Sequence, residues 1–311
     1  MKYKRILVTG GAGYVGAKLV PRLLQEDCDI TVLDLMIYGE DVLPQESERL
    51  NICRGDIRDR KVLQQLIPGH DAVIHLACIS NDPSFELNPA LGKSINKDAF
   101  EPLVDIAKNE GVARFIYASS SSVYGIKKED NVNENMALEP LTDYSKFKAE
   151  CEEVLNSYIS ESFEPVTIRP ATVCGYSKRQ RLDVVVNILT NLAYNNREIT
   201  IFGGEQLRPN IHIDDMIEVY QHFLRNSGLP SGAYNAGFEN MTVLEIAESV
   251  KREVGAEIVM EQSNDPRSYR LNSDKLLASG FKAKSSVLDA VKQLKHRHAK
   301  GELNETDQSY T

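Results

Sequence analysis

The sequence predicts an α/β protein, with a doubly wound parallel sheet followed by a smaller α+β lobe. Three observations predict this fold. Short β-branched runs alternate with longer amphipathic segments in the first half of the 311 residues, Gly, Pro and Asp residues fall between these segments, and the rhythm becomes less regular after about residue 170. Alternation of strand and helix is typical of parallel βαβ units, whose crossover helices cover both faces of a sheet.

The elements of the first lobe follow from the apolar spacing. We expect strands at residues 5–9, 29–34, 72–77, 114–118 and 165–168, which are short apolar runs. We expect helices at residues 13–25, 61–66, 94–110 and 144–161, where apolar residues recur at helical spacing. Turn residues such as Pro68 and Gly69 separate these elements. The first domain is therefore predicted to span residues 1–170.

The second lobe, residues 171–298, has a less regular pattern. A helix is expected at 183–195, strands at 199–202 and 210–213, and a turn at Gly203-Gly204. Further helices are expected at 243–254, capped by Thr242, and at 287–298, preceded by Ser285 and Ser286. Residues 299–311 are polar without apolar periodicity, and we expect a disordered tail there.

Composition excludes several classes of protein. Hydrophobic residues make up 42% and charged residues 26%, which is ordinary for a soluble protein, and no apolar run approaches the roughly 20 residues of a spanning helix. The N-terminus lacks the apolar core and cleavage site of a signal peptide, so we expect a cytoplasmic protein. A net charge of -9 disfavours nucleic acid and membranes as partners. Five widely spaced cysteines without a CxxC pair favour reduced thiols over disulfides or a metal site.

A glycine-rich turn follows the first predicted strand. Gly10, Gly13 and Gly16 recur every three residues at the start of a helix, where they allow a tight turn and close approach of a pyrophosphate. Asp34 ends the second strand, where its carboxylate can accept both hydroxyls of an adenosine ribose and would repel a 2′-phosphate. The pattern predicts NAD rather than NADP as cofactor. The alternative is an ordinary glycine turn with an aspartate that caps a strand.

A possible acid–base pair lies on the helix expected at 144–161. Tyr144 and Lys148 are four residues apart and share one helix face, whereas Lys146 lies on another. A nearby ammonium and a bound, positively charged nicotinamide would both favour the phenolate, the form that removes a proton. Taken alone, this spacing also fits a surface tyrosine and a solvated lysine. The serines of FIYASSSSVYG support the catalytic interpretation, because they follow a buried strand at the carboxyl edge of the sheet, where ligands bind.

These motifs occur in one order that carries a family resemblance. TGGAGYVG, Asp34, GDIRD, HLA at residues 75–77, Asn96, SSSSVYG and YxxxK are followed by IRPATVCG, RLDVVVN and RPNIHIDD. The chain resembles the extended short-chain dehydrogenase/reductases, specifically the NAD-dependent nucleotide-sugar epimerase/dehydratase family typified by UDP-galactose 4-epimerase. The resemblance extends to about Gly280 and implies a Rossmann-type fold.

The resemblance implies roles for individual residues. Ser120, Tyr144 and Lys148 match the catalytic residues of the family. The expected cofactor residues are Gly10, Gly13, Tyr14, Val15, Gly16, Asp34, Asp56, Ile57, Leu76, Ala77, Asn96, Tyr144 and Lys148. The expected substrate-binding residues are Ser120, Thr172, Arg181, Asn187, Arg208 and Arg267, with Arg208 matching the arginine that grips the nucleotide diphosphate, for which a surface salt bridge is the alternative. His212 is expected to be structural.

The chain departs from the family pattern at several positions. Ser121 and Ser122 stand where the 4,6-dehydratases carry acidic residues, which disfavours dehydration. Thr172 replaces an asparagine common in 4-epimerases. The arginine expected just before Asp265 is absent, and Arg267 or Arg270 could replace it.

The resemblance leaves two reactions open. Tyr144 would remove the proton of the sugar 4-hydroxyl while hydride passes to NAD, and return of the hydride to the other face would make a 4-epimer. Release of the ketone would instead make the enzyme a 4-dehydrogenase or, in reverse, a 4-keto reductase. We favour a 4-epimerase acting on a nucleotide-diphosphate sugar, because NAD specificity suits a recycled cofactor. A non-catalytic NAD-binding sensor or scaffold is a further alternative, and the family implies a homodimer formed by the helices that begin near Ser94 and Tyr144.

Overall fold

A computed structural model describes residues 2–80, 82–262 and 268–303. The chain forms two compact units, and it crosses between them several times. Unit 1 contains Met1–Gly125, Ala137–Arg169 and Ile217–Tyr234, and unit 2 contains Ile126–Met136, Pro170–Met216 and Asn235–Thr311. The boundary expected at residue 170 coincides with one crossing, whereas no pattern in the sequence signals the crossings on either side of 126–136 and 217–234.

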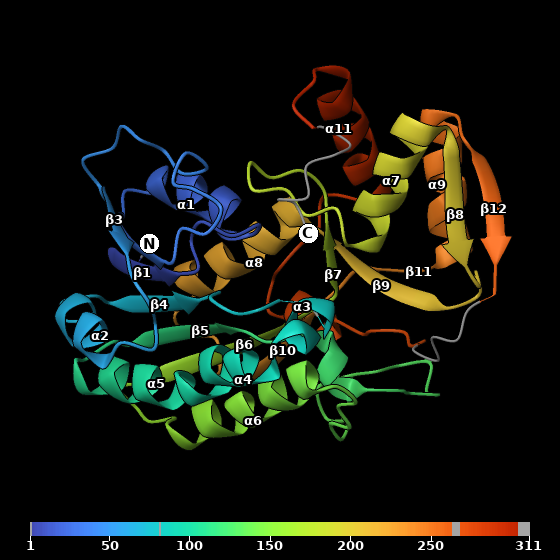
Figure 1. The fold of residues 1–311 in the computed structure, drawn as a ribbon. Helices are drawn as coiled ribbons and strands as arrows, with labels where there is room; N and C mark the ends of the chain where they lie inside the picture. The colour runs from blue at the N-terminus through green and yellow to red at the C-terminus, as the bar shows by residue number, and fades with distance from the viewer. Residues whose placement is uncertain (1, 81, 263–267, 304–311) are drawn as a thin grey trace. The chain divides into compact units, whose positions relative to one another are not determined.

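Unit 1 is built on a seven-stranded sheet (Figure 1). The strand order is β10-β6-β5-β4-β1-β2-β3, and the pairs that join β6, β5, β4, β1, β2 and β3 are all parallel. The chain order reverses at β1, between β2 and β4, which is where open α/β sheets bind ligands. The predicted α/β fold is confirmed. The strands are β1 (Arg5–Thr9), β2 (Asp29–Asp34), β3 (Leu50–Arg54), β4 (Ala72–His75), β5 (Arg114–Ala118), β6 (Glu164–Pro170) and β10 (Gly232–Ala236).

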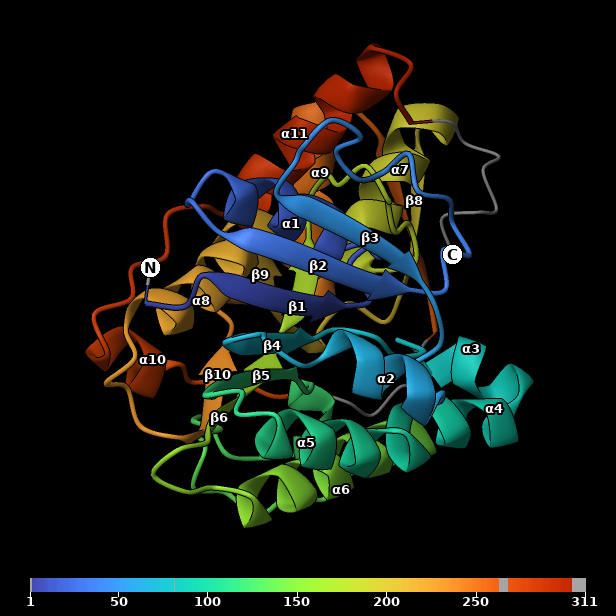
Figure 2. The same ribbon diagram turned by 90° about the vertical axis from the view of Figure 1, so that its left-hand side faces the viewer.

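Helices cover both faces of this sheet. Helices α2 (Arg60–Leu66), α5 (Phe100–Asn109) and α6 (Asp143–Ser157) pack on one face, and α1 (Gly16–Leu24) lies on the other with α8 (Ile213–Arg225) (Figure 2). The core beneath α5 and α6 is aromatic and aliphatic, because the buried faces of both helices carry large apolar side chains. It includes Phe100, Leu103, Phe115, Leu155 and Phe163.

Unit 2 has two small sheets and a group of helices. Strands β7 (Thr172–Cys174), β9 (Leu207–His212) and β11 (Glu239–Thr242) form one sheet, and β8 (Glu198–Phe202) pairs in parallel with β12 (Glu257–Glu261). Its helices are α7 (Val185–Asn196), α9 (Val243–Val254), α10 (Asp274–Ala278) and α11 (Val287–Ala299). The predicted cap of α9 is present, since Thr242 and Glu245 bond to each other's backbone N–H groups.

Several predicted elements differ from the structure. The single helix expected at 94–110 is instead a π-helical segment, η1 (Ser94–Asp98), followed by α5, and two short helices, α3 (Asp82–Leu87) and α4 (Pro89–Lys93), precede it. The strand expected at 210–213 runs over Leu207–His212, and α8 begins directly after it. Order extends into the expected tail, because Leu303 is buried and Glu302 pairs with Arg297; residues 304–311 lie outside the described residues.

Two whole-chain expectations can be compared with the described residues. No helix among them combines the length and the apolar character that a membrane crossing requires. All five thiols are free, with Cys28, Cys151 and Cys174 buried and Cys53 and Cys78 half-buried.

Candidate active site

The glycine-rich turn packs too closely to admit side chains. A Cβ on Gly10, whose φ is +74°, would lie 2.5 Å from the backbone nitrogen of Ala77, and a Cβ on Gly16 would lie 2.5 Å from the Cα of Gly11. The turn therefore lies against the end of β4. Within the described residues, the N–H groups of Val15 and Gly16 reach no backbone acceptor, so the start of α1 offers donors to an anion. These features fit a bound pyrophosphate.

Asp34 ends β2 beside this turn, as the sequence predicts. Its carboxylate accepts hydrogen bonds from the N–H of Ala12 at 3.0 Å and from that of Met36 at 2.8 Å. Each oxygen keeps a lone pair, so the group can still accept a ribose hydroxyl. Met36 adopts a left-handed conformation with φ of 56°, which turns the chain away from Asp34.

Asp56 and Ile57 follow β3, the next strand in the sheet. The guanidinium of Arg58 bonds to the carboxylate of Asp56, with 2.5 Å between Nη2 and Oδ2, and holds its pKa below the ordinary value. Ile57 is buried. A half-buried carboxylate beside an apolar side chain suits the edge of an adenine ring, which presents hydrogen-bonding groups around a flat apolar face.

Leu76, Ala77 and Asn96 shape the chain at the end of β4. The Asn96 side chain accepts from the N–H of Ile79 at 2.8 Å and donates to its carbonyl at 2.9 Å. Asn96 is buried in the π-helical segment, a feature frequent at functional sites. Both ends of the amide therefore fix the loop after β4, and a place of Asn96 in the cofactor groove stays a prediction of the sequence.

Ser120 begins a short 3₁₀ helix, η2 (Ser121–Tyr124), after β5. Its Oγ accepts from the N–H of Ser122 at 3.1 Å and from the Ser122 hydroxyl at 2.9 Å. Because both acceptor positions are taken, the Ser120 hydroxyl proton remains for an outside acceptor.

Tyr144 and Lys148 lie on α6, with Tyr144 in its first turn. The Lys148 ammonium is buried, donates to the carbonyl of Ala118 at 2.6 Å, and lies 5.8 Å from the centroid of the Tyr144 ring. Burial opposes its charge, but the nearby Cys78, Tyr144 and Cys151 groups together raise its pKa. The structure thus brings Lys148 to the strand end that leads into Ser120, and Lys146 points to solvent and pairs with Asp143.

The expected substrate residues lie in unit 2. Thr172 opens β7 opposite Asn210, and Arg208 is half-buried in β9, where its Nη1 donates to the carbonyl of Leu207 at 3.2 Å. Arg181 forms a two-pronged ion pair with Asp183, at 2.9 and 2.5 Å. Its charge is therefore largely balanced within the chain.

Asn187 is fully buried in α7, accepts from the N–H of Gly175 at 2.9 Å and donates to the carbonyl of Arg181 at 2.8 Å. These bonds brace the loop 175–181, and a role of Asn187 in binding the substrate stays a prediction of the sequence. Arg267 lies outside the described residues.

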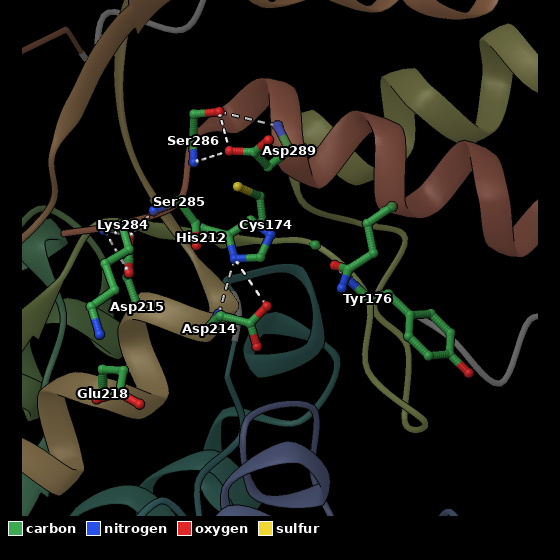
Figure 3. Close-up of polar contacts among 12 residues, drawn as sticks. Cys174, Tyr176, His212, Asp214, Asp215, Glu218, Lys284, Ser285, Ser286 and Asp289 are labelled. Carbon is green, nitrogen blue, oxygen red and sulfur yellow. Dashed lines mark hydrogen bonds and ion pairs between the residues drawn. The ribbon is translucent and has the colours of Figure 1, made fainter.

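His212 is held in a buried polar cluster of unit 2, shown in Figure 3. Its Nδ1 accepts from the N–H of Asp214 at 3.0 Å, which places the ring proton on Nε2. Asp215 accepts from the N–H groups of Lys284 and Ser285, each at 3.0 Å, and ties that segment to the start of α8 (Figure 3). These contacts support a structural role for His212.

Two aromatic side chains near the Lys148 ammonium were not among the predicted site residues. The Tyr117 ring lies 4.9 Å from Nζ, and His75 stacks on Tyr117 at 5.9 Å. A sequence signal for Tyr117 was present, because it lies two residues before Ser119. Side chains two residues apart along an extended chain point to the same face of the sheet.

Comparison with known proteins agrees with this geometry. The model of a family described as "NAD dependent epimerase/dehydratase family" matches residues 6–237. The chain is 25% identical to a UDP-glucose 4-epimerase of Lactobacillus helveticus, over 92% of this chain and 94% of that protein. It is also 28% identical to a dTDP-D-glucose 4,6-dehydratase of Mus musculus, over 93% and 87%.

The fold has close structural relatives. The solved structure of a UDP-N-acetylglucosamine 4-epimerase from Methanobrevibacter ruminantium M1, in complex with UDP-N-acetylmuramic acid, superposes with a TM-score of 0.87 at 24% identity, covering 97% of this chain and all of that one. At this identity the likeness establishes the fold.

Proposed function

The chain belongs to the NAD-dependent epimerase/dehydratase family, and on that premise we propose that it is a nucleotide-sugar 4-epimerase. The family consists of NAD-dependent enzymes that act on nucleotide sugars, so the cofactor and the general class of substrate follow from membership. NAD specificity, which suits a cofactor recycled within the enzyme, favours an epimerase over a dehydrogenase. One observation argues against dehydration. Tyr144, Lys148 and Ser120 are all present in unit 1, whereas the two positions that follow Ser120 carry hydroxyls instead of carboxylates.

The proposed cofactor contacts follow the geometry of unit 1. NAD supplies the hydride acceptor and donor when it is bound. The N-terminus of α1 and the glycine turn would bind its pyrophosphate, Asp34 its adenosine ribose, and Asp56 with Ile57 its adenine. Leu76 and Ala77 would line the groove, and Tyr144 and Lys148 would bond the second ribose.

Tyr144 would take the proton of the sugar 4-hydroxyl. The buried ammonium of Lys148 favours the phenolate form, because a nearby positive charge stabilises a negative one in a poorly hydrated site. Ser120 would donate its remaining proton to the sugar oxygen and so hold the 4-carbon in place. Removal of this proton is common to an epimerase and a dehydrogenase, which is why the same side chains serve both. In an epimerase Tyr144 then returns the proton to the same oxygen, whereas in a dehydrogenase the ketone leaves first.

The serines after Ser120 argue against dehydration. Loss of water across a sugar needs a general acid to protonate the departing hydroxyl. Ser121 is buried and Ser122 bonds to Ser120, and a hydroxyl is a far weaker acid than a carboxyl group. This supports an epimerase or a dehydrogenase among the reactions of the family.

The substrate contacts are proposed for unit 2. Arg208 would bind the diphosphate and Thr172 would face the sugar. Arg181 would bind phosphate only if it exchanged Asp183 for it, and Asn187 would shape the loop that carries Arg181. Arg267 remains a candidate from the sequence alone. A cytoplasmic location, a homodimer through α5 and α6, and the absence of nucleic-acid or membrane partners also remain predictions of the sequence.

A panel of UDP-, GDP-, CDP- and dTDP-sugars tests the proposal. Conversion of a sugar to its 4-epimer without net formation of NADH supports it. Accumulation of NADH with a 4-keto sugar would establish the alternative, a 4-dehydrogenase or 4-keto reductase, and a 4-keto-6-deoxy product would establish a dehydratase. Binding of NAD without turnover of any sugar would favour a sensor or scaffold.

A further inference from the structure

A buried ion pair in unit 1 has no role in the chemistry described so far. Glu152 of α6 is 2% exposed and Arg169 of β6 is 6% exposed. The Nε of Arg169 donates to both oxygens of Glu152, at 3.1 and 3.0 Å, and its Nη2 donates to Oε2 at 2.6 Å. In many proteins a buried ion pair stabilises the fold no more than apolar side chains of the same volume, because removal of two charges from water costs free energy. Stability alone therefore does not explain the directional bonds of this pair.

The pair reaches both ends of the segment that carries Ser120. At one end, the hydroxyl of Ser119 donates to Oε1 of Glu152. At the other end, Nη1 of Arg169 donates to the hydroxyl of Tyr124 at 2.8 Å, and the guanidinium lies 5.0 Å from the centre of that ring. Residues 119–124 are therefore clamped by one carboxylate and one guanidinium.

The same contacts fix helix α6 to this segment. Glu152 lies one helical turn beyond Lys148, whose Nζ bonds to the carbonyl of Ala118, the residue before Ser119. Two successive turns of α6 are thus bonded to two successive residues at the end of β5. This arrangement sets both the rotation of the helix and its position along its axis, and hence the position of Tyr144 in its first turn.

We propose that Glu152 and Arg169 are positioning residues that hold Ser120 and Tyr144 in register for proton transfer. The inference rests on the proposed function of Tyr144 and Ser120. Neither charge is proposed to contact the sugar or the cofactor. Their effect is geometric, because a shift of about 1 Å between reacting groups costs on the order of 100-fold in rate.

The chain supplies a matched control on the same two strands. Arg114 and Glu164 are the first residues of β5 and β6, at the opposite edge of the sheet. Arg114 is fully buried, and its Nη2 lies 3.0 Å from Oε2 of Glu164. Glu164 is half-buried, and loss of this pair would disturb the same two strands at a point far along both from Ser120.

The test compares Glu152→Gln and Arg169→Lys with Glu164→Gln. Amide hydrogen exchange, followed by mass spectrometry without cofactor or sugar, should be faster in residues 119–125 of the first two variants and unchanged there in the control. With the sugar identified by the panel, kcat should fall about 100-fold in Glu152→Gln, with KM and the Kd of NAD within about twofold of wild type. Glu152→Asp should recover part of the loss, because it restores the charge.

Two outcomes would overturn the inference. The first is exchange in residues 119–125 that matches the Glu164→Gln control; the second is an equal effect on kcat and KM, which indicates general loosening. If Glu152→Gln does not fold, Tyr124→Phe, which removes one hydroxyl, should still speed exchange at that end. A wild type that turns over no nucleotide sugar would refute the proposed function, and the exchange data would still decide whether the clamp exists.

Discussion

Lys148 keeps a charge where water is almost absent. It is 3% exposed, and its Nζ donates a hydrogen bond to the carbonyl of Ala118 and lies 4.9 Å from the centroid of the Tyr117 ring. The negative face of an aromatic ring and a carbonyl oxygen together replace part of the lost hydration. Nearby Cys78, Tyr144 and Cys151 outweigh the effect of burial and raise the pKa of Lys148, so the ammonium persists at neutral pH.

Tyr144→Phe should abolish most turnover and spare the fold. The change removes the proton acceptor, and general acid–base groups contribute roughly 100- to 10,000-fold to rate. We expect kcat to fall by about that factor, while the Kd of NAD, measured by calorimetry, rises only severalfold. Tyr158→Phe, at the other end of α6, is the control and should be fully active. Unchanged turnover in Tyr144→Phe would remove the mechanism.

Asp34→Asn should weaken NAD and relax the choice of cofactor. The variant keeps one acceptor for the N–H groups of Ala12 and Met36 but loses the charge that would bond the ribose hydroxyls. A hydrogen bond to a charged group is worth about 1.5–3 kcal/mol, which corresponds to roughly a 10- to 100-fold rise in the Kd of NAD. The Kd of NADP should fall, because repulsion of the 2′-phosphate is gone. A wild type that binds both cofactors equally would refute this role.

Single residues also show where sequence reasoning ends. The patterns identified Gly10, Asp34 and Lys148, and the structure brings each to the same edge of the sheet. Asn96 and Asn187 lie in motifs as well, but their amides are bonded to the backbone of Ile79 and of Gly175. A motif gives the position of an asparagine in the chain, whereas the partner of its amide depends on loops that only the folded chain brings together.

At the level of elements, strongly patterned segments were predictable and weakly patterned ones were not. The bounds of β1, β2 and β5 agree with the prediction, because these strands are buried apolar runs. β3 was missed, since it lies at the edge of the sheet and none of its five residues is fully buried. The π-helical segment η1 could not be seen either, because its spacing of apolar residues resembles that of the α-helix it joins.

Two threonine caps allow an element-level test of α6. Thr142 caps α6 and Thr242 caps α9, each through a capping box. Replacing either by Ala should cost about 1 kcal/mol of unfolding free energy, which is a factor of about five in the equilibrium constant for fraying of the first turn. Only Thr142→Ala should also lower kcat, by up to that factor, because Tyr144 lies in that turn. Equal kcat values in the two variants would show that the first turn is held by other contacts.

At the level of the whole molecule, the sequence patterns did not predict which distant segments join the same unit. The sheet of unit 1 ends in β10, which follows β6 only after more than 60 residues, most of them in unit 2. Segment 126–136 belongs to unit 2, although the residues on either side of it belong to unit 1. Segment 217–234 belongs to unit 1, although the residues on either side of it belong to unit 2. Hydrophobic periodicity reports which face of an element is buried, but not which unit buries it.

The buried ring of His75 makes the stability of the folded chain depend on pH. It is 3% exposed, its Nδ1 lies 2.7 Å from the hydroxyl of Thr9, and burial, followed by the nearby charge of Lys148, lowers its pKa from 6.5 to about 3. The unfolded chain therefore binds a proton on this ring below pH 6.5, whereas the folded chain does not. Stability from this group is complete above pH 6.5 and is lost progressively as the pH falls toward 3.

Urea unfolding at two pH values measures this effect. Between pH 7 and pH 5 the His75 ring should account for about 2 kcal/mol of the lost unfolding free energy in the wild type. His75→Gln keeps a partner for Thr9 and cannot be protonated, so it should start less stable at pH 7 yet lose about 2 kcal/mol less on acidification. His296→Gln, which removes an exposed histidine, should follow the wild type. If His75→Gln loses as much stability as the wild type, the folded protein takes up a proton at His75 as readily as the unfolded chain, and its burial does not limit acid stability.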